Sequence, residues 1–219
     1  TSKCGSLCAL LSASQSIGVP QPLKLFGTEA QKKKFLPQIA KGGITAFALT
    51  EVNAGSDPAN MTTAATPSED GAHWTIDGEK LWCTNGTRAD LFVVMARTPD
   101  RMVNGKLRKK QITAFIVDAK TPGISVKHRC RFMGLKAIEN GWMSFKNVQV
   151  PAENILWGEG KGLKLALITS SARLRPSSAF SLALFVRPTS LKIWPSLRNI
   201  FASIRFLRLL SSIESTTRC

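Results

Sequence analysis

Apolar and polar positions along the chain change their pattern twice, and these changes divide the sequence into three parts. Residues 1–43 look helical, residues 44–151 show the short runs typical of strands, and a helical pattern starts again after Gly162. We therefore expect the end of a helical domain at 1–43, a β-domain at 44–160, and the start of a second helical domain at 161–219.

The first part predicts two helical stretches. The stretch before residue 28 is rich in small and apolar residues but is broken at Pro20 and Pro22. Thr28 can cap the next helix with its hydroxyl group, and Gln31 stands three residues further on, as a capping box requires. The glycine pair at residues 42–43 should end this helix.

Short apolar or alternating runs, separated by turn residues, fill the middle of the chain without an intervening helical stretch. Asp77–Gly78 is a dipeptide typical of tight turns, so we expect a hairpin with this dipeptide at its tip. Residues 99–110 are predicted to be a long basic loop. Strands at this spacing indicate an antiparallel barrel or sandwich. The predicted strand segments are 45–50, 73–86 (the hairpin), 89–98, 111–119, 123–129 and 141–151.

The first predicted strand ends in a loop of small and polar residues, FALTEVNAGSDPAN at 47–60. Gly55 allows the backbone to approach a ligand closely, and Thr50 and Ser56 offer hydroxyl groups. Together with free backbone amides, these groups suit an anionic or carbonyl-rich ligand. The same residues are also typical of a well-capped surface turn.

The chain is strongly basic, with a formal net charge of +16 over 219 residues. The basic residues are dispersed over segments such as 31–35, 106–110 and 127–131, and no basic helix is interleaved with aromatic residues. We therefore expect an anionic cofactor or substrate rather than nucleic acid. No apolar run is long enough to predict a membrane-spanning helix.

The five cysteines and two histidines are scattered and form no CxxC pair. No metal site is expected, and free thiols in a reducing compartment are the simplest interpretation. The N-terminus lacks an initiator Met and the basic and apolar segments of a secretory signal, so we expect a cut end without a targeting segment.

Five blocks, spread over about residues 9–173, resemble the acyl-CoA dehydrogenase family, and more narrowly its very-long-chain branch. They occur in the order and at the spacing of that family, and five blocks together are far more specific than one glycine-rich loop. The blocks are LFGTEAQKKKFLPQIAKGG, FALTEVNAGSD, IDGEKLWCTNGTRADLFVVMART, ITAFIVDAKTPGI and MGLKAIENGWMSFKNVQVPAENILWGEGKG.

The resemblance implies an α+β fold, in which an antiparallel β-barrel-like middle domain is flanked by partial helical segments of an incomplete acyl-CoA dehydrogenase fold. The implied activity is the FAD-dependent α,β-dehydrogenation of fatty acyl-CoA in fatty acid β-oxidation. Family members are commonly homo-oligomers that pass electrons to an electron-transferring flavoprotein. The implied compartment is the bacterial cytoplasm or the mitochondrial matrix.

The resemblance also assigns cofactor contacts to the loop after the first strand. In the family, backbone groups matching Phe47 and Leu49, with a hydroxyl matching Thr50, hold the pyrimidine edge of the flavin. Groups matching Gly55 and Ser56 approach the pyrophosphate of FAD. Ser56 also matches a position that touches the acyl-CoA substrate.

A second segment, Trp82-Cys83-Thr84, resembles the tryptophan block of the family. There the residue matching Trp82 packs beside the isoalloxazine ring, and the hydroxyl matching Thr84 meets the flavin N5 atom. A hydrogen bond at N5 helps to orient and tune the ring. Without the resemblance, Trp82 would be interpreted as a core residue.

The chain departs from the family pattern after about residue 173. The family base is a glutamate of the C-terminal helical domain, and no residue here is assigned that role, so no catalytic residue is predicted. Glu214 is interpreted as an isolated acid in a Ser-rich tail. We expect residues 174–219 to be an aberrant, poorly packed tail, and the chain to be inactive as an enzyme. The alternative is a non-catalytic remnant or a basic binding protein that retains the β-domain.

Overall fold

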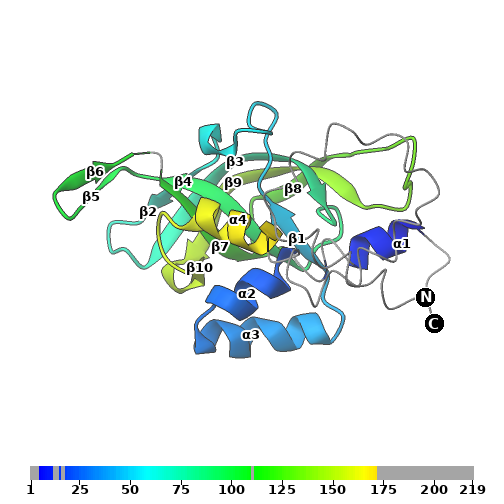
Figure 1. Ribbon diagram of the computed structural model, residues 1–219, viewed down its shortest axis with the longest axis horizontal. Helices are drawn as coiled ribbons and strands as arrows, with labels where there is room; N and C mark the ends of the chain where they lie inside the picture. Colours follow the sequence, from blue (N-terminus) through cyan, green and yellow to red (C-terminus); the bar gives the residue numbers. More distant parts are fainter. Residues whose placement is uncertain (1–4, 12–14, 16–17, 110, 172–219) are drawn as a thin grey trace, which may run out of the picture. The chain divides into compact units, whose positions relative to one another are not determined.

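The computed structural model describes residues 5–11, 15, 18–109 and 111–171 (Figure 1). Helices come first, strands fill the middle, and another helix follows, in the order expected from the sequence. The predicted tail, with Glu214, lies outside the described residues. The helices are α1 (Gly5–Ala9), α2 (Pro20–Phe26), α3 (Glu29–Ala40) and α4 (Gly162–Ser171), with 3₁₀ turns η2 (Pro58–Asn60) and η3 (Ala152–Asn154). The strands are β1 (Thr45–Ala48), β2 (Ala64–Pro67), β3 (His73–Thr84), β4 (Leu91–Thr98), β5 (Arg101–Val103), β6 (Lys106–Arg108), β7 (Gln111–Asp118), β8 (Ile124–Arg129), β9 (Asn140–Pro151) and β10 (Ile155–Leu156).

Most strands form one sheet, in which β10, β7, β4, β2, β3, β9 and β8 follow one another. The outer strands β10 and β8 do not pair, so the sheet is open rather than closed into a barrel. Its pairs are antiparallel as expected, except that β1 and β2 both run parallel to β4. These two strands lie end to end along β4, since Thr45 pairs with Leu91 and Ala64 pairs with Arg97. The connecting loop, residues 49–63, therefore leaves the sheet between β3 and β4.

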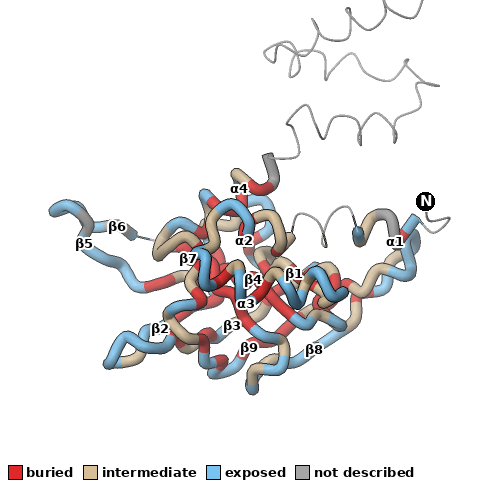
Figure 2. Tube along the Cα trace, turned by 90° about the horizontal axis from the view of Figure 1, so that it is seen from below, coloured by how far each residue is buried: buried red, intermediate tan, exposed pale blue. Residues whose placement is uncertain are grey.

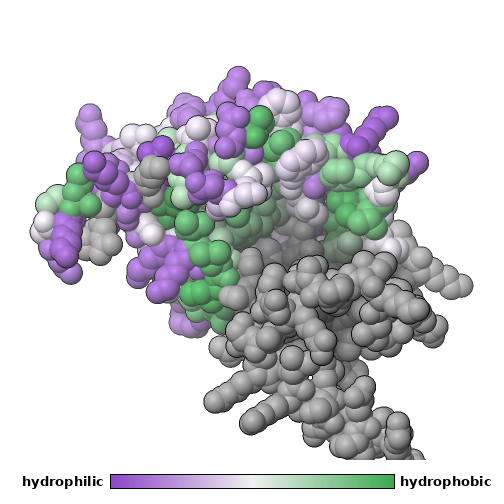
Figure 3. Space-filling view, turned by 45° about the horizontal axis from the view of Figure 1, so that its top comes forward, coloured by the Kyte–Doolittle hydropathy of each residue, from purple (hydrophilic) through white to green (hydrophobic). Residues whose placement is uncertain are grey.

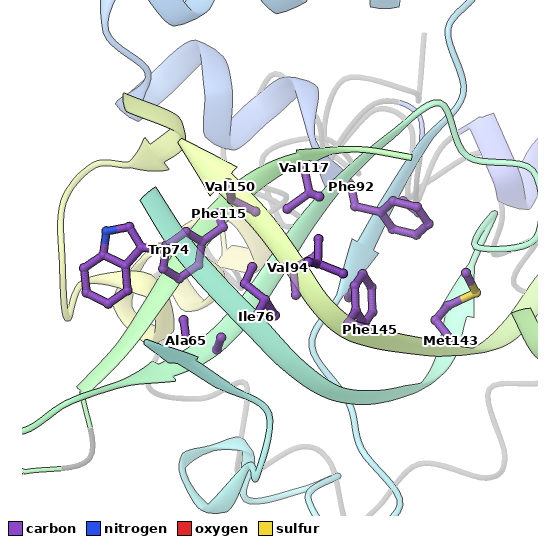
Figure 4. Close-up of a cluster of buried hydrophobic side chains, with 14 of the residues drawn as sticks. Ala65, Trp74, Ile76, Phe92, Val94, Phe115, Val117, Met143, Phe145 and Val150 are labelled. Carbon is purple, nitrogen blue, oxygen red and sulfur yellow. The ribbon is translucent and has the colours of Figure 1, made fainter. Parts of the chain in front are cut away.

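Residues of β4 alternate between two apolar cores, one on each face of the sheet. In the first core, the rings of Phe92 and Phe145 meet edge to face, with centroids 5.9 Å apart (Figure 4). Val93 packs on the other face, with Leu23 of α2 and Phe35 of α3. Helices α2, α3 and α4 thus cover one face of the sheet, and Figure 2 shows the buried positions along its central strands. None of the described helices is long and apolar enough to span a membrane.

The helical segments confirm one local prediction and correct another. The Thr28 hydroxyl accepts a hydrogen bond from the Gln31 N–H at 3.2 Å, and the Gln31 side chain accepts one from the Thr28 N–H at 3.0 Å, which completes the capping box. The predicted break is confirmed at Pro20, where α2 begins after a bend at Val19, but it is wrong at Pro22, which lies inside α2. Proline lacks an N–H group, but the first turn of a helix does not need one there.

The predicted hairpin at Asp77–Gly78 is also wrong, because β3 runs unbroken from His73 to Thr84. Gly78 has a φ of 148°, and the pairing of β3 with β9 changes register between Ile76 and Gly78. The Asp77 carboxylate accepts a hydrogen bond from the Asn147 N–H at 2.8 Å. The dipeptide therefore forms part of a β-bulge, which uses the conformational freedom of glycine without reversing the chain.

Gly78 gives a first testable prediction. A Cβ atom there would lie 2.5 Å from Thr63 Oγ1 and 2.6 Å from Thr63 Cα. We expect Gly78→Ala to lower the free energy of unfolding by more than about 1 kcal/mol, as measured by urea denaturation. Gly71→Ala is the control, since Gly71 also has a positive φ but a Cβ there would meet no atom within 4 Å. Equal losses in the two variants would contradict the close-contact explanation.

The segment predicted as a basic loop contains a hairpin, formed by β5 and β6. Asn104 and Gly105 at its tip have φ angles of 52° and 72°, as the Asn-Gly pair of a type I′ turn requires. Met102 and Leu107 are register partners, and both are more than half exposed. Figure 3 shows this hairpin at the left, with green apolar and purple hydrophilic side chains together.

Candidate functional site

The structure places side by side the two segments that the sequence analysis assigned to one site. Thr50, just after β1, accepts a hydrogen bond at its backbone carbonyl from the Leu81 N–H of β3 at 2.8 Å. The Cys83 thiol donates to the Phe47 carbonyl at 3.7 Å. Burial raises the pKa of Cys83 to about 12, so the thiol keeps its proton. The loop after β1 and the end of β3 therefore form one junction.

A buried ion pair, which the sequence analysis missed, holds this junction together. Lys80 of β3 is fully buried, and its Nζ donates to Glu51 Oε1 at 2.8 Å and to the Leu49 carbonyl at 3.1 Å. The Glu51 carboxylate also accepts hydrogen bonds from the N–H and hydroxyl of Thr62, at 2.6 and 2.7 Å, and from the Thr63 N–H at 3.0 Å. One carboxylate thus ties the start of the loop between β1 and β2 to its end.

Glu51 is therefore a structural anion. Burial alone would raise the pKa of Glu51, but hydrogen bonds from Lys80 and Thr63 and the charge of Lys80 outweigh this effect and lower the pKa to about 2. Burial lowers the pKa of Lys80, and the Glu51 carboxylate opposes that change. A general base needs a pKa near the working pH, so Glu51 is poorly suited to removing a proton from a substrate.

A second carboxylate, Glu139 near the end of β3, is also paired with a cation. Arg129 Nε donates to Glu139 Oε2 at 2.9 Å, and the Thr87 hydroxyl donates to the same oxygen at 2.7 Å. Hydrogen bonding from Arg129, and then from Thr87, lowers the pKa of Glu139. Neither Glu51 nor Glu139 is thus poised to act as a base.

The loop between β1 and β2 exposes Gly55 and Ser56. Neither residue hydrogen-bonds to another described residue, so their backbone amides are available to a ligand. Gly55 has no positive φ, and a Cβ there would meet no atom within 4 Å. The fold itself thus places no demand for glycine at this position. Open space beside free amides fits the close approach of an anionic group.

Trp82 is not the core residue that the pattern alone indicates, because it is 52% exposed. Its φ of 56° is unusual for a bulky side chain, and the pairing of β3 with β9 changes register between Lys80 and Cys83. A bulge at this point turns the indole ring outward, where it lies 5.7 Å from the Phe132 ring. The fold therefore presents an aromatic surface beside the loop after β1.

The remaining predicted site residues are placed as follows. The carbonyl groups of Phe47 and Leu49 face β3, because Cys83 and Lys80 donate to them. Ligand contacts from Phe47 and Leu49 stay predictions, and these contacts would have to use groups other than the two carbonyls. Thr84 ends β3, and its hydroxyl oxygen accepts a hydrogen bond from Asn140 Nδ2 at 3.3 Å.

The sequence is similar to that of known proteins over most of the described part. The chain is 54% identical over 167 residues to the probable acyl-CoA dehydrogenase FadE10 of Mycobacterium tuberculosis, a match that covers 76% of this chain and 25% of the relative. It is 42% identical over 173 residues to the human mitochondrial very long-chain specific acyl-CoA dehydrogenase, a match that covers 78% of this chain and 26% of the relative. The chain thus spans about a quarter of the length of these curated relatives.

Solved structures share the fold. The butyryl-CoA dehydrogenase of Megasphaera elsdenii superposes with a TM-score of 0.67 at 41% identity, over 75% of this chain and 41% of the other. An acyl-CoA dehydrogenase from Bacillus anthracis, complexed with FAD, gives a TM-score of 0.67 at 36% identity, over 75% of this chain and 27% of the other.

Two family models complete the comparison. The acyl-CoA dehydrogenase N-terminal domain matches residues 1–43, and the acyl-CoA dehydrogenase middle domain matches residues 46–148. These are domains of flavin-dependent oxidoreductases, and this chain belongs to the acyl-CoA dehydrogenase family.

Proposed function

We propose that this chain supplies part of the FAD site of an acyl-CoA dehydrogenase. The observation that carries the proposal is the junction itself, where the open loop at Gly55 and Ser56 and the outward-facing Trp82 come from segments joined by the Thr50–Leu81 hydrogen bond. FAD is an anionic cofactor with a flat ring. Free amides suit its pyrophosphate, and an exposed indole suits its ring.

Each residue of the site would have a separate role. The Thr50 hydroxyl, with backbone groups of Phe47 and Leu49, would hold the pyrimidine edge of the flavin. The amides of Gly55 and Ser56, together with the Ser56 hydroxyl group, would bind the pyrophosphate.

The ring contacts would come from the end of β3. Trp82 would pack beside the isoalloxazine, and the Thr84 hydroxyl would donate a hydrogen bond at N5. FAD, when bound, supplies the acceptor for hydride from the β-carbon of a fatty acyl-CoA. Ser56 would also touch that substrate. An electron-transferring flavoprotein as electron acceptor, a homo-oligomeric assembly, and a bacterial cytoplasmic or mitochondrial matrix location belong to the same proposal.

The reaction also needs a base for the proton next to the thioester carbonyl. Two carboxylates near the junction are poorly suited to this role: Glu51, whose pKa is about 2, and Glu139, whose pKa is lowered by its hydrogen bonds. We therefore propose that the 219-residue polypeptide by itself binds flavin without turning over acyl-CoA. Robust dehydrogenation by this polypeptide would contradict that part of the proposal.

Flavin titration of the purified chain tests the site. We expect weak FAD binding, because only part of the contacts is preorganised by the described residues. Trp82→Ala should weaken FAD and riboflavin binding alike, by roughly two- to tenfold. Ser56→Ala should weaken FAD binding but leave riboflavin binding unchanged, since riboflavin has no pyrophosphate. Flavin fluorescence measures both affinities.

Met102→Ala is the matched control, because Met102 is an exposed apolar residue on the distant β5–β6 hairpin. It should leave both affinities unchanged. An effect of Met102→Ala equal to that of Trp82→Ala would indicate nonspecific flavin adsorption to apolar surface and would overturn the proposed site.

A further inference from the structure

We propose that Asn140 is a positioning residue, which turns the Thr84 hydroxyl into a hydrogen-bond donor toward the flavin N5 atom. The inference rests on the proposed function, and it adds to that function a residue for which the sequence analysis gave no role. Asn140 begins β9 and is the register partner of Thr84 on β3.

The side-chain amide of Asn140 lies between two groups of β3. Its Nδ2 donates to the Trp82 backbone carbonyl and to the Thr84 hydroxyl oxygen, each at 3.3 Å. The contact with the carbonyl fixes the orientation of the amide, because an oxygen in that position would be repelled. The Thr84 hydroxyl is therefore an acceptor on the Asn140 side.

The hydrogen bond from Asn140 determines which further hydrogen bonds the Thr84 hydroxyl can make. A hydroxyl has one donor hydrogen and two acceptor lone pairs. Because Asn140 has no hydrogen-bond acceptor in contact with Thr84, the hydroxyl hydrogen is left for another partner. A hydroxyl that already accepts a hydrogen bond is also a stronger donor. The flavin N5 atom is an acceptor. A Thr84 hydroxyl that accepts a hydrogen bond from Asn140 can therefore donate its own hydrogen to N5, as the proposed contact requires.

Asn140 is buried, and one of its side-chain polar atoms has no hydrogen-bond partner among the described residues. Its residue surface is only 6% exposed, and its Oδ1 has no hydrogen-bond partner among the described residues. A buried, unpartnered amide oxygen is unfavourable, and such groups are rare in folded proteins. The backbone carbonyl of Asn140 accepts a hydrogen bond from the Cys130 N–H at 2.8 Å, which fixes the start of β9. The two donor contacts of Asn140 are thus made while its side-chain oxygen stays unpaired among the described residues.

The same amide also supports the exposed ring. Trp82 has a positive φ, and a bulky residue keeps such a conformation only where its surroundings impose it. The Asn140 contact with the Trp82 carbonyl is one of these constraints. One side chain thus fixes both groups of β3 that are proposed to face the flavin.

The test compares FAD with 5-deaza-FAD, which carries a C–H group in place of the N5 acceptor. In the unaltered chain, FAD should bind more tightly than 5-deaza-FAD, by roughly two- to tenfold for one hydrogen bond. Asn140→Leu, which has a similar volume but no amide, should bring this ratio close to one. Asn140→Ala serves as a second variant with less steric risk. Thr84→Val should remove the preference as well, and combining it with Asn140→Leu should have no further effect on the ratio.

Ser144→Ala is the control, because Ser144 lies on the same strand and its buried Oγ also has no hydrogen-bond partner among the described residues. It should keep the full preference for FAD. A purely structural role of Asn140 would weaken both flavins equally and keep the ratio, and that result would overturn the inference alone. Failure of the unaltered chain to bind either flavin would overturn the proposed function, and the inference with it.

Discussion

Replacement of Lys80 by methionine should lower the free energy of unfolding by about 3–5 kcal/mol, the loss typical of breaking one side of a buried ion pair. Lys80 is fully buried, and its Nζ lies 2.8 Å from Glu51 Oε1. Methionine fills a similar volume but leaves the Glu51 carboxylate buried without its cation. Urea denaturation followed by circular dichroism measures the change.

A second variant separates the charge from the packing. Lys80→Met combined with Glu51→Leu should recover most of the lost stability, because no buried charge is then left without a partner. Lys34→Met is the control, since Lys34 and its partner Glu153 are at least half exposed, and it should cost less than about 1 kcal/mol. A double variant as unstable as Lys80→Met would show that the ion pair is not the cause.

Stability should also fall steeply in acid, because of Glu51. Its folded-state pKa of about 2 is lower than the ordinary value of 4.5. The contribution of Glu51 to stability is therefore fully present above about pH 4.5, and it is lost as the pH falls toward about 2. The shift corresponds to about 3 kcal/mol. Denaturation midpoints measured between pH 5 and pH 2, roughly the titration window of carboxylates, follow this loss.

The matched comparison is again the double variant of Glu51→Leu with Lys80→Met. Other carboxylates whose pKa is lowered, such as Glu79 and Glu139, remain in both proteins. The difference between the two stability curves therefore reports the buried pair. Parallel curves over this range would contradict the assignment of a strongly lowered pKa to Glu51.

Local sequence signals predicted much of the fold. The capping box at Thr28 and Gln31 involves residues three apart, so its geometry is determined by the helix itself. The error at Asp77–Gly78 came from a glycine whose role depends on a distant neighbour. Gly78 lies against Thr63 and forms a bulge, and no signal within its own segment distinguishes that bulge from a turn. The Asn104–Gly105 turn, in contrast, had a clear signal that was missed.

The candidate site was predicted through family resemblance more than through pattern. Glu51 and Lys80 are far apart in the sequence, and although both lie in segments that resemble the family, no local pattern indicates that they pair. One signal could have indicated Lys80. Like Trp74 and Ile76, Lys80 occupies one of the alternating positions of β3 that point inward, where a charged residue needs a buried partner. The wrongly predicted hairpin at Gly78 interrupted this alternation in the prediction. The outward turn of Trp82 depends on a bulge against β9, which no local pattern encodes.

We propose that the loop after β1 and the end of β3 form one flavin surface. Amide hydrogen exchange, measured with and without FAD, tests it most directly. Binding should slow exchange in residues 49–57 and 81–85, and leave the β5–β6 hairpin at 101–108 unchanged. Slowed exchange in only one of the two segments, or equal slowing in the hairpin, would contradict the claim.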